Sequence, residues 1–217
     1  MNTLDLNSLV STLLADSSNN FYTQEERLQA LNSACNYLNS ELRILRQIVE
    51  ITVTPLDGGR IPIPSDFVSI SYGTQWRSQN KNVIQLRQTT PQRLQAGLGS
   101  NWNTDVGEPS QYVMEGSNIY LTPQPKEAGT VVLSYVATPN KLIEDTDIPF
   151  YGDPRIQAYH DMIAFYAAWQ LCLKDRDFEA AQMFMQYFQT RLIDLKENLR
   201  HTGDIVQPVW SDTYAVT

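Results

Sequence analysis

Four helical segments enclose a long β-rich stretch in this chain, and this order constrains the fold more than any other feature. Apolar stripes with spacings of three and four fill residues 4–49 and 154–200, whereas period-two alternation with frequent Pro and Gly fills residues 51–137. The first pattern is typical of helices and the second of strands. The order therefore predicts an α+β protein in which a β domain interrupts a helical one.

The first two helices are predicted from their stripes and from a capping sequence. Residues 4–15 place apolar side chains on one helical face, and Asp16 begins a run of turn formers. Thr23 and Glu26 then form a capping box, in which each side chain bonds the other residue's amide. A heptad stripe follows, made by Leu28, Leu31, Cys35, Leu38, Leu42, Leu45 and Val49. This stripe is interpreted either as a seam between subunits or, preferably, as a bundle core within one subunit.

Turn residues divide the β-rich stretch into short strands. Gly116 and Ser117 form a two-residue hairpin loop, and the prolines of 61–66 limit that segment to an edge strand or a connector. Thr90 as cap and Pro91 as first helical residue predict one or two helical turns. The expected strands cover residues 51–54, 67–72, 83–87, 111–115, 118–122 and 130–137. Strands this short, at this spacing, predict a small antiparallel β-sandwich or barrel.

A second pair of helices follows the β-rich stretch. Asp153 and Pro154 are expected to start the first of them, as N-cap and first helical residue. Polar residues at 174–177 break the pattern before the last helix, and Gly203 is suited to close that helix in a left-handed conformation. So short a link between two helices predicts a hairpin.

These elements predict three parts. Neither helical pair can bury its stripe alone, so residues 1–50 and 150–203 are expected to form one helical bundle domain. Residues 51–149 are expected to form an inserted β domain, and residues 204–217 an extended C-terminal arm.

The arm is rich in large apolar side chains, which free chain ends usually lack. Its 14 residues can reach about 45 Å when extended. The arm either folds back on its own domain or docks on a partner, and the second interpretation is favoured. The residues expected to bind a partner protein or a neighbouring subunit are Ile205, Val206, Val209, Trp210 and Tyr214.

Composition and motifs argue against several functions. With 24 acidic and 16 basic side chains the net charge is −8, which argues against general affinity for nucleic acid. No stretch approaches the roughly 20 apolar residues of a membrane span. The two histidines and two cysteines lack the spacing of metal ligands, so neither a metal site nor a cofactor is expected. The sequence also lacks a nucleophile motif, so the protein is not expected to be an enzyme. Cys35 and Cys172 are expected to be buried free thiols.

The ordered set of motifs resembles the head-to-tail adaptor (connector) proteins of tailed bacteriophages, over residues 1–55 and 107–200. The first motifs are the short helix and the capped Leu-stripe helix. The remaining motifs are Tyr112-Val-x-x-Gly116-x-x-Ile119-Tyr-Leu121-x-Pro123-x-Pro125, then 131–135, Asp145-x-Asp147-x-Pro149, and the Ala- and aromatic-rich segments 164–168 and 177–181.

The resemblance implies a structural virion protein. Such proteins form a ring, commonly a dodecamer, that joins the portal protein to tail or nozzle proteins. Genomic DNA passes through the ring without sequence-specific binding. Two alternatives are a regulatory, DNA-associated helical protein, which would need a basic helix face that this chain lacks, and an enzyme of unidentified chemistry.

Overall fold

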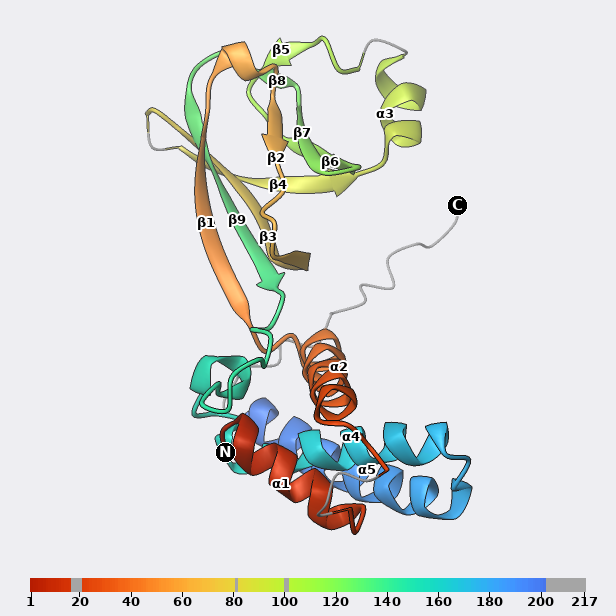
Figure 1. The fold of residues 1–217 in the computed structure, drawn as a ribbon. Coiled ribbons are helices and arrows are strands. Elements are labelled where there is room, and N and C mark those ends of the chain that lie inside the picture. Colours follow the sequence, from red (N-terminus) through yellow and green to blue (C-terminus); the bar gives the residue numbers. More distant parts are fainter. Residues whose placement is uncertain (17–20, 81, 100–101, 202–217) are drawn as a thin grey trace. The chain divides into compact units, whose positions relative to one another are not determined.

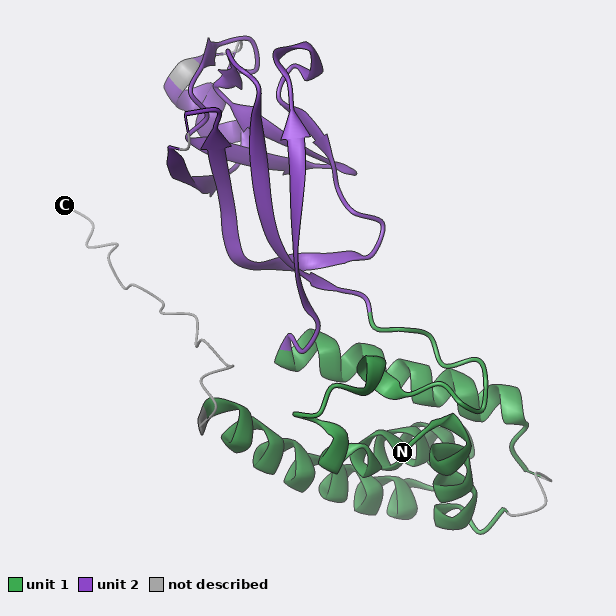
Figure 2. Cartoon of the chain, turned by 90° about the vertical axis from the view of Figure 1, so that its left-hand side faces the viewer, with its two compact units in different colours: residues 1–42, 139–217 green, residues 43–138 purple. Residues whose placement is uncertain are grey.

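The computed structural model of the 217-residue chain describes residues 1–16, 21–80, 82–99 and 102–201. In this part of the chain, five α-helices accompany a nearly closed, mixed seven-stranded sheet (Figure 1). The predicted α+β class is therefore confirmed. The chain divides into a helical unit, residues 1–42 with those from 139 onward, and a β unit, residues 43–138 (Figure 2).

The first two helices begin at capping boxes. α1, Thr3–Leu13, starts after Asn2, whose side-chain oxygen accepts a hydrogen bond from the Asp5 amide at 2.9 Å. α2, Gln24–Leu42, starts after Thr23. The Thr23 amide donates to the Glu26 carboxylate at 3.0 Å, and the Glu26 amide donates to the Thr23 hydroxyl at 3.2 Å, which confirms the predicted box.

The heptad stripe does not continue as a helix to Val49. α2 ends at Leu42, Arg43 adopts a left-handed φ of 51°, and strand β1 occupies Arg46–Val53. The spacing of Leu45 and Val49 extended the helical pattern by coincidence. This segment is rich in β-branched residues, which lose side-chain freedom in a helix and favour a strand.

The second helical pair comprises α4, Asp161–Lys174, and α5, Phe178–His201. The prediction that Asp153 and Pro154 start an α-helix was wrong, because residues 149–160 form only short 3-10 turns. The Asp153 carboxylate instead accepts hydrogen bonds from the Arg155 backbone and guanidinium, both at 3.0 Å. The predicted break before α5 is confirmed, and the Asp177 carboxylate accepts from the Ala180 amide at 3.1 Å.

Aromatic rings form much of the contact among α2, α4 and α5. The Tyr166 ring of α4 stacks on Tyr37 of α2 with centroids 5.0 Å apart, and it meets Phe188 of α5 edge-on at 5.1 Å. Phe188 is 1% exposed. Because α4 also contacts α1, residues from both ends of the chain share the apolar interior of the helical unit.

A buried ion pair fixes the end of α1 against α2. Asp16 and Arg27 are 3% and 2% exposed, and their carboxylate and guanidinium are 2.6 Å apart. The Asp16 carboxylate also accepts the Tyr22 amide at 3.0 Å. The Tyr22 hydroxyl donates to Asp175 at 2.5 Å, and burial together with this bond raises the pKa of Tyr22.

The β unit is built on one sheet with the strand order β1-β9-β3-β4-β6-β7-β2. Besides β1, its strands are β2 Arg60–Pro62, β3 Phe67–Ser78, β4 Val83–Thr89, β6 Gln111–Glu115, β7 Asn118–Thr122 and β9 Gly129–Ala137. The short strands β5, Val106–Gly107, and β8, Gln124–Pro125, form a separate parallel pair. β2 is the last strand in this order, which confirms that part of segment 61–66 forms an edge strand.

The sequence predicted a wholly antiparallel sheet, but the observed sheet is mixed. β4 and β6 run parallel, with Arg87 opposite Gln111. Parallel neighbours require a crossover connection, and α3, Pro91–Leu98, lies within it. The Thr90 hydroxyl accepts from the Arg93 amide at 3.4 Å, which confirms Thr90 as its cap.

The interior of the β unit is apolar and tightly packed. Trp76 is 2% exposed, and a Cβ added to Gly129 would lie 2.3 Å from its ring, so only glycine fits opposite the indole. β6 and β7 pair antiparallel up to Glu115 and Asn118, which confirms the hairpin at residues 116 and 117. The buried set also includes Val53, Ile61, Leu86, Tyr112, Ile119, Leu121, Val131, Leu133, Tyr135 and Ala137.

Candidate functional site

The arm residues expected to bind a partner, namely Ile205, Val206, Val209, Trp210 and Tyr214, lie outside the described residues. Gly203, the predicted closing residue of the last helix, lies outside them too. α5 leads directly into this segment. The described elements offer two apolar surfaces that a partner or the arm itself could contact.

An open groove of about 410 Å³ runs along one side of the α4–α5 pair, and we call it the α4–α5 groove. Its apolar lining consists of Trp169, Leu173, Phe178, Ala181 and Met185. Phe178 is 67% exposed and Leu173 38% exposed. The groove therefore presents large apolar surface that the described residues of the helical unit leave uncovered.

The polar lining of the groove consists of Gln182, Gln186 and Gln189, without a charged side chain among the described lining residues. Interface cores are depleted in charge and enriched in aromatic residues and Met. This surface was not predicted from the sequence. Its signal is weak, because Phe178, Gln182, Met185 and Gln189 recur at helical spacing but alternate between apolar and amide side chains.

A second exposed apolar site is a strained turn after Ile148. Phe150, Tyr151 and Gly152 all adopt left-handed φ values, of 54°, 55° and 75°. Asn140 holds the turn, since its amide donates to the Ile148 carbonyl at 2.9 Å and its oxygen accepts from the Tyr151 amide at 3.1 Å. Phe150 is buried and Tyr151 is 70% exposed, so the turn displays one aromatic ring to solvent.

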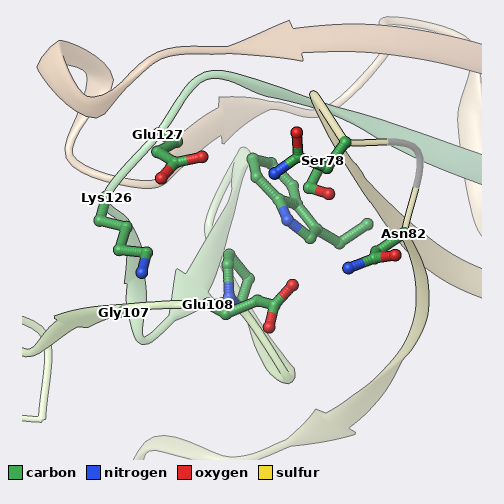
Figure 3. Close-up of a pocket in the computed structure, with 9 residues that line it drawn as sticks. Ser78, Asn82, Gly107, Glu108, Lys126 and Glu127 are labelled. Carbon is green, nitrogen blue, oxygen red and sulfur yellow. The ribbon is translucent and has the colours of Figure 1, made fainter.

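The β unit contains a pocket of about 210 Å³ that is lined in part by Trp76. Ser78 and Asn82 lie on one side of it, Lys126 and Glu127 on the other, and Glu108 below them (Figure 3). The pocket mixes amide, hydroxyl and oppositely charged groups. The described residues that line it include no histidine or cysteine that could act as base or nucleophile.

Among the described residues, no group of three or more His, Cys, Asp or Glu side chains could hold a metal ion. His160 is buried, and its Nδ1 lies 3.2 Å from the Met1 carbonyl oxygen. In the same part of the chain, every helix is too short or too polar to cross a bilayer.

Both cysteines are buried free thiols, as predicted. Burial raises the pKa of Cys35 to about 12 and also raises the pKa of Cys172. Only the thiolate attacks disulfides, so with Ellman's reagent at pH 8 the native protein should react at least ~100-fold more slowly than the urea-unfolded chain. Equal rates in the two states would contradict the burial of both thiols.

The acidity of the chain belongs to the helical unit. By sequence, its residues include 17 acidic and 8 basic side chains, a net charge of −9, whereas the β unit has 7 acidic and 8 basic side chains, a net charge of +1. The helical unit therefore carries the negative field that repels polyanions.

Comparison with known proteins identifies a family. A family model described as SU10 adaptor protein matches residues 1–209, including residues 71–106, for which the sequence had suggested no resemblance. A search of curated proteins finds no match. The match spans both units and confirms the resemblance noted from the motifs. The chain belongs to the SU10 adaptor protein family, whose members are structural adaptor proteins of phages.

Proposed function

We propose that the protein forms a head-to-tail adaptor ring that joins the portal protein to tail or nozzle proteins of a tailed phage. The match of residues 1–209 to a phage adaptor family carries this proposal. An adaptor must present separate surfaces to its own copies and to other proteins. The α4–α5 groove, the Tyr151 turn and the apolar arm offer such surfaces.

The C-terminal arm is proposed to attach the protein to the portal or to a neighbouring subunit. Val209, Trp210 and Tyr214 dock on the portal or on a neighbouring subunit, because Trp and Tyr are the residues most often found as interface hot spots. A strand-like addition of the arm to a sheet edge would supply main-chain hydrogen bonds as well. Ile205 and Val206 extend the apolar contact toward the helix.

Genomic DNA is proposed to pass through the ring without specific contacts. The net charge of −8, to which the helical unit contributes −9 and the β unit +1, supports this role, because like-charge repulsion keeps DNA from adhering to a channel wall. No catalytic step and no cofactor are assigned to the protein.

Mass measurement tests the ring. On portal-bearing heads, or with isolated portal rings, the bound protein should add the mass of a closed ring; twelve chains of 24.7 kDa would add about 300 kDa. Heads that lack the portal are the control and should bind none. A chain that remains a monomer and ignores the portal would overturn the proposal.

A further inference from the structure

We propose that, before assembly, the C-terminal arm packs antiparallel to α5 in the α4–α5 groove of its own subunit. This inference rests on the proposed function in one respect, that the arm is later handed to the portal or to a neighbouring subunit. Before assembly, the groove thus binds the C-terminal arm of the same chain.

The groove and the arm match in chemistry. The groove joins the aromatic rings of Trp169 and Phe178 to the flexible thioether of Met185, a side chain that adapts to varied apolar shapes. The arm offers Val209, Trp210 and Tyr214. The groove lining contains no charged side chain, and neither do these three arm residues, whereas Asp212, between Trp210 and Tyr214, stays hydrated at the open side of the groove.

The amide side chains of the groove also fit an extended ligand. Gln182, Gln186 and Gln189 are exposed. Each side-chain amide offers both donors and an acceptor, so together they can bond the main-chain groups of a segment that lacks a sheet partner. An extended segment carries such groups at every residue, except for the missing donor of Pro208.

The length of chain beyond α5 matches the groove. Gly203 can adopt the left-handed conformation that reverses a chain after a helix. Helical rise places Gln189 about 18 Å and Phe178 about 35 Å from His201 along α5. An extended chain from Gly203 covers about 23 Å to Trp210 and about 36 Å to Tyr214. Trp210 then lies near Gln189 and Tyr214 near Phe178.

The high effective concentration of the tethered arm favours its contact with the groove of its own subunit. A short tether holds the arm near its own groove at an effective concentration in the millimolar range, well above that of other copies in dilute solution. The contact would cover two apolar surfaces that promote aggregation when both are exposed. Portal binding then exchanges one apolar contact of the arm for another.

A cysteine pair in the full-length chain tests the placement. Ser211→Cys leaves Val209, Trp210 and Tyr214 in place, and Gln189→Cys puts the second thiol in the groove. The matched control is Thr190→Cys with Ser211→Cys. Thr190 is also exposed and differs by one residue in tether length, but it lies 100° around the helix and outside the groove lining. The native thiols are buried and do not compete.

Under dilute oxidising conditions, the groove pair should form an intrachain disulfide at least ~10-fold faster than the control pair, as read by peptide mapping and non-reducing gels. Equal rates would mean a free tether, and disulfides only between copies would mean an intersubunit site; either result, or the absence of a disulfide, overturns the proposal. The mass of the portal complex is measured separately, so a failure here is distinguishable from a failure of the adaptor function.

Discussion

Asp16→Ala should lower the unfolding free energy of the helical unit by about 3–5 kcal/mol, because it leaves a buried guanidinium without its counter-charge. The Asp16 carboxylate lies 2.6 Å from Arg27, and both side chains are 2% exposed. The same carboxylate accepts the amides of Phe21 and Tyr22, so its loss also frees backbone donors. Urea unfolding followed by circular dichroism at 222 nm measures the change.

Two further variants show whether burial is the cause. The Lys196–Glu41 pair is of similar length, at 2.5 Å, but its side chains are 38% and 42% exposed. Lys196→Ala should therefore cost no more than about 1 kcal/mol. Adding Arg27→Met to Asp16→Ala should recover part of the loss, since no unpaired charge then remains buried. Equal losses for Asp16→Ala and Lys196→Ala would show that burial does not govern this pair.

Phe188→Ala should cost about 3–5 kcal/mol, the usual range for removing a fully buried aromatic side chain. Its ring contacts Tyr166 of α4 at 5.1 Å and Tyr37 of α2 at 5.8 Å, so the variant leaves a cavity where three helices meet. The loss should appear in thermal unfolding of the helical signal. This experiment also tests the prediction that both helical pairs share one core.

Tyr187→Ala is the adjacent control. Tyr187 is 52% exposed and stacks on Phe165 with centroids 5.6 Å apart, so its removal should cost about 0.5–1.5 kcal/mol. If the two neighbouring variants melt alike, Phe188 does not fill a tight interior and α5 is not anchored through it.

Local signals in the sequence predicted most elements of the fold. The capping residues Thr23 and Thr90 begin helices where expected, because a cap depends only on residues within one turn. The hairpin at Gly116 follows for the same reason. In contrast, Asp153 and Pro154 carry a cap sequence, yet Asp153 bonds Arg155 and α4 begins at Asp161.

Features that depend on distant residues could not be predicted. Asp16 was interpreted only as a turn former, because its partner Arg27 carries no signal of burial in the sequence. The parallel pairing of β4 and β6 depends on the path through α3, which alternation does not encode. The α4–α5 groove escaped notice because two helices must be placed side by side before their shared surface exists.

The helical unit is assembled from two separated segments, and this has a consequence during synthesis on the ribosome. α2 ends at Leu42, but α4, which packs on both α1 and α2, begins only at Asp161. At roughly 5–20 residues per second, the wait is several seconds or more. The β unit is contiguous and can fold in that interval, once its last strand, β9, emerges to pair with β1 and β3. Until α4 emerges, α2 of the nascent chain has only α1 beside it, so Leu31 and Leu38 lack part of their cover and this stretch is expected to bind a chaperone.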